Sequence, residues 1–370
     1  MLALAVSLYA MSKKIQGYLE ILQGCLQVSN SVPFIAEVNQ MEKIDFVILW
    51  VDGSDPEWLE QKNEYAPKKE DFRSGKNRFR DWDNLRYWFR GVEEYAPWVN
   101  NVYFITWGHV PAWLNTDHPK LKIVKHTDFI PEKYLPTFNS DTIETNLFRI
   151  EELSETFVLF NDDFFLIDDV EPSDFFKNGK PCDSFVENLI APVGRAGITH
   201  TKVVITDIIN THFDKRNVHK QFKGKIYNKN YGIQNLITLY FMPFRYFTGF
   251  RNPHIAQSHL KSTFRKMWEI EGEALDQSCS NRFRGTNDVS HWLMRYWNMC
   301  NGCFEPRSVN FGHYFEAGNN NRKVCSCIRE QKYKTICIND MSVDFDFEKA
   351  KSEINSAFSE ILPMHSTFEK

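Results

Sequence analysis

Four short apolar runs lie between residues 44 and 166, and the first and fourth of them end in acidic clusters. Runs of this length, rich in β-branched and aromatic side chains, are typical of strands buried on both faces of a sheet. Segments with a helical spacing of apolar residues separate them. This alternation predicts an α/β fold with a mainly parallel, Rossmann-like sheet and helices on both faces. The predicted strands are residues 44–51, 101–107, 121–124 and 157–160.

Two helices are predicted between these strands. One has apolar residues at i, i+3, i+4 and i+7 from Leu85 to Val92, with Asp83 as its N-cap. The other begins with a capping box made by Asp141 and Glu144.

The second half of the chain is less periodic. We expect helices over residues 253–268 and 288–299, and a last helix that ends at Pro363. Three regions follow from this change of pattern. They are an N-terminal helical extension (1–42), an α/β core (43–190), and a mostly helical part packed on that core (191–370).

The net charge of -4 gives no general basic field, which argues against a nucleic-acid partner. Residues 214–229 are nevertheless dense in Lys and Arg, as in a solvated face or a contact with an anionic polymer or membrane leaflet. The apolar start is shorter than a membrane span of about 20 residues. It also precedes Lys13 and Lys14, whereas a secretory signal follows its positive charges. We expect a cytoplasmic protein, docked peripherally on the inner face of the plasma membrane by a helix over 2–26 and by the basic run.

Five of the eight cysteines lie late in the chain. Their spacing is compatible with a structural zinc site, but the one-residue gap in the second pair favours free thiols. The five are Cys300, Cys303, Cys325, Cys327 and Cys337.

Asp162 and Asp163 follow the fourth predicted strand directly. Parallel strands end at one edge of a sheet, where ligands bind, and carboxylates there can hold Mg²⁺ or Mn²⁺ against phosphate oxygens. Asp52 and Asp55, after the first strand, would share that edge. A turn or a helix N-cap explains such residues equally well.

Two further candidates stand later in the chain. His254 is a general base, a phosphate contact or a hydrogen-bonded structural residue. Arg284 is a pyrophosphate clamp or a surface ion-pair partner. No Walker loop, G-x-G-x-x-G fingerprint or G-x-S-x-G elbow is present in the sequence, which excludes the commonest kinases, dinucleotide enzymes and serine hydrolases.

The ordered series of motifs resembles the conserved regions of the Stealth family. Its members include bacterial capsular polysaccharide phosphotransferases and the lysosomal-enzyme N-acetylglucosamine-1-phosphotransferase. Residues 44–55 resemble the first region, and segments between 78 and 164 resemble the second. Pro253-His254, with Arg284 and Asp288 downstream, resembles the third region, and residues 338–340 resemble the fourth.

The resemblance implies a nucleotide-sugar-transferase-like fold, a UDP-N-acetylhexosamine donor such as UDP-N-acetylglucosamine, Mg²⁺ or Mn²⁺, and a polysaccharide or oligosaccharide acceptor. The acceptor hydroxyl attacks the phosphorus that bears the sugar, UMP leaves, and a phosphodiester remains. Two alternatives stay open on the residues alone: a metal-dependent glycosyltransferase that releases UDP, and a non-catalytic glycan-binding protein.

The residues at the matched positions suit distinct roles in such a transfer. His254 is the expected base, and Asp52 or Asp55 orients the donor or the acceptor. The metal would be held by Asp163 and Asp340. The expected donor-binding residues are Arg78, Asp162, Arg284 and Asp288.

Overall fold

The computed structural model describes residues 43–66, 80–192, 198–340 and 345–370. Residues 42–370 form one compact unit. The helix predicted over 2–26 and the candidate Arg78 lie outside the described residues. The predicted division of the unit at residue 190 stays a prediction.

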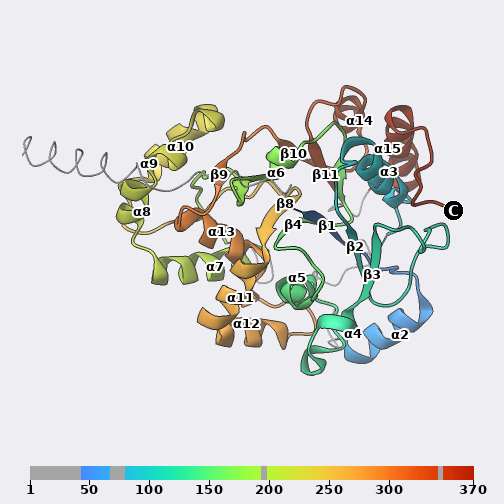
Figure 1. Cartoon of the computed structure of the whole chain (residues 1–370), viewed down its shortest axis with the longest axis horizontal. Coiled ribbons are helices and arrows are strands. Elements are labelled where there is room, and N and C mark those ends of the chain that lie inside the picture. Colours follow the sequence, from blue (N-terminus) through green and yellow to red (C-terminus); the bar gives the residue numbers. More distant parts are fainter. Residues whose placement is uncertain (1–42, 67–79, 193–197, 341–344) are drawn as a thin grey trace, which may run out of the picture. The chain divides into compact units, whose positions relative to one another are not determined.

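A five-stranded sheet with the order β3-β2-β1-β4-β8 forms the centre of this unit (Figure 1). The first four strands are parallel, and β8 runs antiparallel to β4. The four strands predicted from the sequence are therefore confirmed, as is the mainly parallel α/β class. The strands are β1 (Ile44–Leu49), β2 (Val102–Thr106), β3 (Leu121–Lys125), β4 (Thr156–Phe160) and β8 (Gln257–Leu260).

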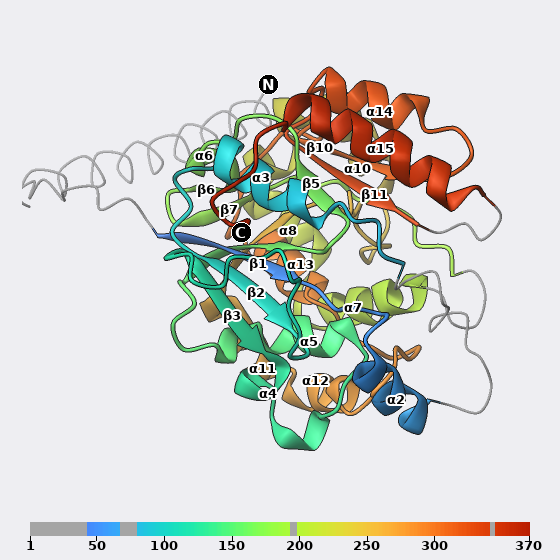
Figure 2. The same ribbon diagram turned by 90° about the vertical axis from the view of Figure 1, so that its right-hand side faces the viewer.

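Helices cover both faces of the sheet, as Figure 2 shows. Successive strand residues point to opposite faces, so Phe46 and Phe160 enter one apolar layer, while Val47 and Phe157 enter the other. The first layer contains α3 (Leu85–Tyr95), α14 (Arg322–Arg329) and α15 (Phe347–Ile361). The second contains α5 (Ser140–Asn146), α11 (Lys261–Ile270), α12 (Gly272–Cys279) and α13 (Trp292–Cys300).

The C-terminal half contributes strands as well as helices. A second sheet has the order β10-β11-β5, and a third has the order β6-β7-β9. Because β11 pairs with β5, residues 335–339 lie beside the turn that follows β4. The strands are β5 (Phe164–Leu166), β6 (Phe176–Lys177), β7 (Lys180–Asp183), β9 (Glu305–Pro306), β10 (Gly312–Glu316) and β11 (Thr335–Asn339).

The remaining helices are mostly short, and none of the helices in the described ranges is long and apolar enough to cross a membrane. They are α2 (Pro56–Tyr65), α4 (His126–Phe129), α6 (Pro172–Phe175), α7 (Ile198–His212), α8 (Lys215–Gln221), α9 (Lys223–Ile226) and α10 (Asn235–Phe241), with 3-10 turns η3 (Glu132–Tyr134), η4 (Leu147–Arg149) and η5 (Lys229–Gln234).

Three local predictions were wrong. Residues 257–260 form β8 rather than helix, because pairing with β4 outweighs their helical spacing. The N-cap of α3 is Asn84, not Asp83, whose φ is +50°. The N-cap of α5 is Asn139, whose side chain accepts from the Asp141 N–H (3.1 Å), so Asp141 and Glu144 form no capping box.

Candidate active site

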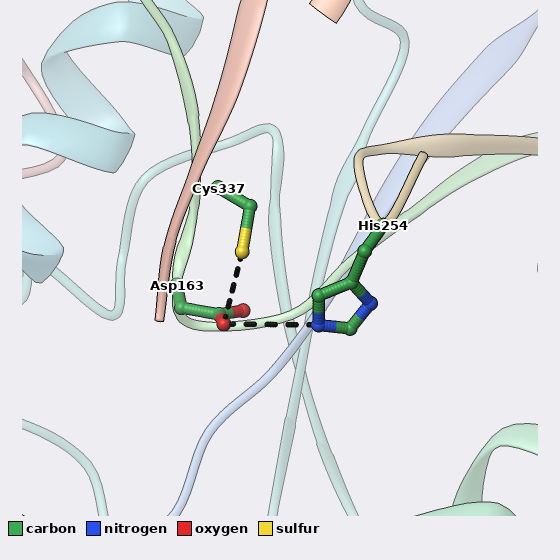
Figure 3. A group of neighbouring side chains, drawn as sticks. All are labelled: Asp163, His254 and Cys337. Carbon is green, nitrogen blue, oxygen red and sulfur yellow. Dashed lines mark hydrogen bonds and ion pairs between the residues drawn. The ribbon is translucent and has the colours of Figure 1, made fainter. Parts of the chain in front are cut away.

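Three side chains from distant parts of the chain meet beside the end of β4 (Figure 3). Asp163 lies in the turn between β4 and β5, His254 lies just before β8, and Cys337 lies in the middle of β11. The pairings β4–β8 and β5–β11 bring them together. The Asp163 Oδ2 atom lies 3.3 Å from the Cys337 Sγ and 4.0 Å from the His254 Nε2. The ligand atoms of all three lie within 4.8 Å of one another.

The Asp163 carboxylate has hydrogen-bond partners for only one of its two oxygen atoms among the described residues. Its Oδ1 is buried and has no hydrogen-bond partner among the described residues, while its backbone carbonyl accepts from the N–H of Ile338 (2.9 Å). Burial raises the pKa of Asp163 to about 7, and the neighbouring Asp162 carboxylate adds to the shift. The Cys337 hydrogen bond and the charge of Arg284 oppose that rise. A cation beside Asp163 would offset its negative charge and give Oδ1 a partner.

His254 is held in an unusual backbone conformation, with φ at +49°. Its N–H donates to Asn252 Oδ1 (3.0 Å), and its ring packs edge-on against Phe164 at 5.0 Å. Burial lowers the pKa of His254 to about 4, and the nearby cationic groups His291, Lys202 and Arg284 act in the same direction. The imidazole is thus neutral near pH 7 and able to accept a proton.

Cys337 was not recognised as a site residue from the sequence. Burial, followed by the negative charge of Asp163, raises the pKa of its thiol well above the ordinary value. The thiol therefore stays protonated and donates to Asp163. The signal that could have found it is its place in an apolar strand directly before Asn339-Asp340.

The late cysteines form no disulfide among the described residues. Within the described ranges, they form no group with metal-binding geometry, apart from the contribution of Cys337 to the cluster with Asp163 and His254.

Arg284 lies on a loop that is held by hydrogen bonds to the carboxylate of Asp288. Asp288 is buried, and its carboxylate accepts from Asn139 Nδ2 (3.0 Å), Asn281 Nδ2 (2.8 Å) and the Gly285 N–H (2.6 Å). Arg284 itself donates to the Ser140 hydroxyl. Its charge also acts on the pKa values of Asp163 and His254, which places it near the cluster. The observed role of Asp288 is to shape this loop, and a donor contact stays a prediction.

Asp52 and Asp55 lie at the same sheet edge as Asp163, because β1 and β4 are parallel neighbours. Asp52 accepts from the N–H and the hydroxyl of Ser54 (2.8 and 2.6 Å). Asp55 is the N-cap of α2 and accepts from the Trp58 N–H (2.9 Å). His109 joins the two, since its Nε2 accepts from the Asp52 N–H (2.7 Å) and its Nδ1 lies 3.5 Å from Asp55 Oδ2. These contacts shape the turn, and a substrate role stays a prediction.

Asp340 follows β11 and pairs with Arg80 (3.5 Å). Its Oδ1 is buried without a hydrogen-bond partner among the described residues. Burial raises the pKa of Asp340, and the charge of Arg80 opposes the rise. Asp162, next to Asp163, is exposed to solvent.

Two other residues near His254 were missed from the sequence. His291 forms a buried pair with Glu144 (2.6 Å), and the Lys202 ammonium lies 5.2 Å from the ring centre of Trp292. Burial lowers the pKa of Lys202. Neither residue stands in a local motif, so only the folded chain shows that they lie near His254.

Known proteins resemble this chain along most of its length. Residues 42–70 match Stealth protein CR1, conserved region 1, and residues 78–183 match Stealth protein CR2, conserved region 2. The chain is 43% identical over 335 residues to the capsular polysaccharide phosphotransferase WcwK of Streptococcus pneumoniae, covering 89% of this chain and 100% of that protein. It is 40% identical to the exopolysaccharide phosphotransferase cps2G of Lactiplantibacillus plantarum, covering 88% of this chain and 96% of that protein. Among solved structures, the galactosyltransferase LgtC matches with a TM-score of 0.34 and 10% identity, over 84% of this chain and 95% of that one.

Proposed function

The chain belongs to the Stealth family of polysaccharide phosphotransferases, and we propose that it transfers a hexosamine-1-phosphate from a UDP-sugar to a hydroxyl group of a capsular or other surface polysaccharide. In this reaction the acceptor oxygen forms a bond to the phosphorus that bears the sugar. The bond from that phosphorus to the UMP oxygen breaks, and a phosphodiester remains. The observation that carries the proposal is the meeting of the His254 imidazole with the partly buried carboxylate of Asp163.

His254 is the proposed general base. Its Nε2 lies 4.0 Å from Asp163 Oδ2. An acceptor hydroxyl that binds next to Asp163 therefore also comes within reach of the imidazole. The fixed backbone and the edge contact with Phe164 hold the ring in place. The base takes the acceptor proton as the new P–O bond forms.

We propose Mg²⁺ or Mn²⁺ held by Asp163 with Asp340, although the cluster of ligand atoms within 4.8 Å among the described residues contains Asp163, His254 and Cys337 and not Asp340. Both carboxylates have one buried oxygen without a hydrogen-bond partner among the described residues, and carboxylate oxygens are the ligands that these ions prefer. The Cys337 thiol is protonated and serves as a donor to Asp163 rather than as a ligand. When bound, such an ion neutralises charge on the phosphate oxygens.

Arg284 is the proposed clamp for the donor pyrophosphate. Its guanidinium is anchored through Ser140, and its loop is fixed by Asp288, so little side-chain entropy is lost on binding. We also propose that Arg78 and Asp162 contact the donor, and that Asp52 or Asp55 orients the donor or the acceptor. A cytoplasmic location with peripheral attachment to the inner face of the plasma membrane belongs to the same proposal.

The test is product analysis with UDP-N-acetylglucosamine, Mg²⁺ or Mn²⁺, and a panel of oligosaccharide acceptors. Release of UMP, with a phosphodiester phosphorus signal in the product, supports the proposal. Release of UDP would instead identify an ordinary glycosyltransferase.

Three variants test the assigned residues in the same assay. Asp163→Asn, His254→Gln and Arg284→Gln should each lower turnover about 100-fold or more, because each removes charge stabilisation or proton transfer. The matched control is Asp168→Asn, which alters a half-exposed carboxylate paired with Lys334. Unchanged melting temperatures show that the variants fold. Wild-type turnover by His254→Gln would refute its role as the base.

A further inference from the structure

Exposed apolar side chains concentrate in one short segment. Of the fifteen large apolar side chains exposed among the described residues, eight lie within residues 233–246. Ile233 and Tyr240 are the most open of them, with 77% and 71% of their surface exposed. The eight define what we call the 233–246 surface: Ile233, Leu236, Ile237, Leu239, Tyr240, Met242, Phe244 and Tyr246.

The polarity of α10 is the reverse of that of an ordinary surface helix. Thr238 and Phe241 face the protein, whereas Leu236, Leu239 and Tyr240 face solvent. A helix on a water-facing surface normally presents polar residues outward. Exposed apolar clusters of this kind mark interaction sites.

Hydrogen bonds from buried residues of the protein hold residues 233–246 in this orientation. The Thr238 hydroxyl accepts from the Glu187 N–H (3.2 Å), and the Lys215 ammonium donates to the carbonyl of Phe241 (2.7 Å). Lys215 and Glu187 are themselves a buried ion pair (2.6 Å). The apolar side chains therefore face outward because the anchored backbone directs them there.

The surrounding charge is mainly positive, and the exposed Asp214 lines one hollow together with Arg245 and Tyr246. From Lys215 to Trp268 the sequence contains eleven Lys and Arg and no Asp or Glu, in a chain whose net charge is -4. Five of these cations are exposed and belong to α8, α9 and the residues beside α10, which follow one another along one margin in Figure 1. The five are Arg216, Lys220, Lys223, Lys229 and Arg245.

We propose that the 233–246 surface docks on an anionic lipid bilayer. The apolar side chains would enter the boundary between headgroups and acyl chains, and the cations would contact the headgroups. Tyr240 and Tyr246 are suited to this interface, because their rings are apolar and their hydroxyls are polar. A mainly cationic rim favours an anionic lipid surface over an isologous second copy, in which the same cations would face one another. The inference rests on the proposed peripheral location, and it is independent of the proposed reaction.

The experiment is vesicle flotation of the full chain, without donor, acceptor or metal. Vesicles of phosphatidylcholine alone are compared with vesicles that also contain phosphatidylglycerol, at low and high salt. We expect binding to the anionic vesicles that weakens as salt rises. The substituted positions in all variants are exposed, so folding should be retained. Far-UV circular dichroism and the melting temperature check the fold of each variant.

Two sets of variants separate the apolar and the charged contributions. Ile233→Ser, Leu236→Ser and Tyr240→Ser combined should lower partitioning about 100-fold. Lys220→Gln, Lys223→Gln and Lys229→Gln combined should lower binding to the anionic vesicles by a similar factor.

Matched controls make the same chemical changes elsewhere on the surface. Val110→Ser, Ile270→Ser and Met364→Ser replace three exposed apolar residues, and should leave partitioning unchanged. Lys177→Gln, Lys323→Gln and Lys332→Gln replace three exposed cations, and should have little effect.

Several outcomes would overturn the inference. The full chain could fail to bind anionic vesicles, or the apolar triple variant could bind as tightly as the wild type. Binding that appears only after removal of residues 1–42 would show that this segment covers the surface instead. A change of oligomeric state in the apolar variant, with vesicle binding intact, would identify a second copy as the occupant. Because flotation needs no turnover, failure of the UMP assay leaves this result unaffected.

Discussion

Replacement of Cys337 tests whether the buried thiol is a hydrogen-bond donor to Asp163 or a thiolate ligand of a metal ion. The side chain is fully buried in the middle of β11, and its Sγ lies 3.3 Å from Asp163 Oδ2. Cys337→Ala removes this donor, whereas Cys337→Ser keeps a donor at nearly the same position. The two variants therefore separate the hydrogen bond from the sulfur atom itself.

The expected magnitudes follow from that single contact. A hydrogen bond to a charged group contributes about 1.5–3 kcal/mol, and a thiol, as a weak donor, contributes about 1 kcal/mol. Since 1.36 kcal/mol corresponds to a tenfold change in rate, Cys337→Ala should lower kcat about fivefold. The space left by the sulfur should also lower the free energy of unfolding by about 1 kcal/mol. Cys337→Ser should retain kcat within about twofold, because the hydroxyl still donates to Asp163.

The assay is steady-state turnover with a Mn²⁺ titration for each variant. Cys327→Ala is the control, because it removes another buried thiol, from α14, and should affect stability alone. If Cys337 instead bound the metal as a thiolate, both Cys337 variants would lose activity by orders of magnitude. Serine would then give no rescue, and the Mn²⁺ requirement would rise in both variants. That pattern would refute the assignment of Cys337 as a donor.

Two further predictions concern the framework around the site. Glu369→Gln should lower the free energy of unfolding by about 3 kcal/mol in urea titrations, because it breaks the buried bidentate pair with Arg90 (2.7 and 2.9 Å), and a loss below about 1 kcal/mol would contradict this. Burial alone would raise the pKa of Glu369, but the Arg90 hydrogen bond holds that pKa below its usual 4.5. The contribution of the ionised Glu369 to stability is therefore present above pH 4.5 and is lost as the pH falls through the folded-state pKa. The wild type should thus lose more stability in acid than the variant. Gly312→Ala would place a Cβ 2.6 Å from Thr335 Cγ2 and 2.7 Å from the Thr335 carbonyl oxygen, so β10 and β11 must separate. We expect a loss of about 2 kcal/mol with reduced kcat, since β11 carries Cys337, and unchanged melting and turnover would show that the strands adapt freely.

The strands of the parallel sheet could be predicted because their residues alone carry the signal. Each is a short apolar run buried on both faces, such as residues 44–49 and 156–160. β8 carries no such signal, since Gln257, Ser258 and His259 are polar residues that become buried only by pairing with β4. Its strand conformation is therefore a product of tertiary contact.

The site divides in the same way. The position of Asp163 at the end of a predicted strand indicated its place at the sheet edge, and the resemblance to the Stealth family singled out His254. Neither argument could show that Cys337 touches Asp163, because that contact depends on antiparallel pairing across 174 residues of sequence. The same holds for Asn139, which became the N-cap of α5 through the backbone conformation at that residue. The position of a residue could be predicted where its own strand determines it. It could not be predicted where pairing with a distant strand determines it.

The 233–246 surface shows why an apolar pattern alone can mislead. A segment that contains Ile233, Leu236, Tyr240 and Phe244 has the composition of a core helix, and a sequence argument assigns it to the interior. In the folded chain, the buried Lys215–Glu187 pair occupies the inner side and anchors the backbone of α10, so the apolar side chains are directed outward. The basic run at 214–229 was noticed from the sequence, and the fold adds an exposed apolar segment that follows it. Each feature alone has an ordinary explanation, as a solvated face or as core, and their combination on one anchored surface is what favours an anionic bilayer as the partner.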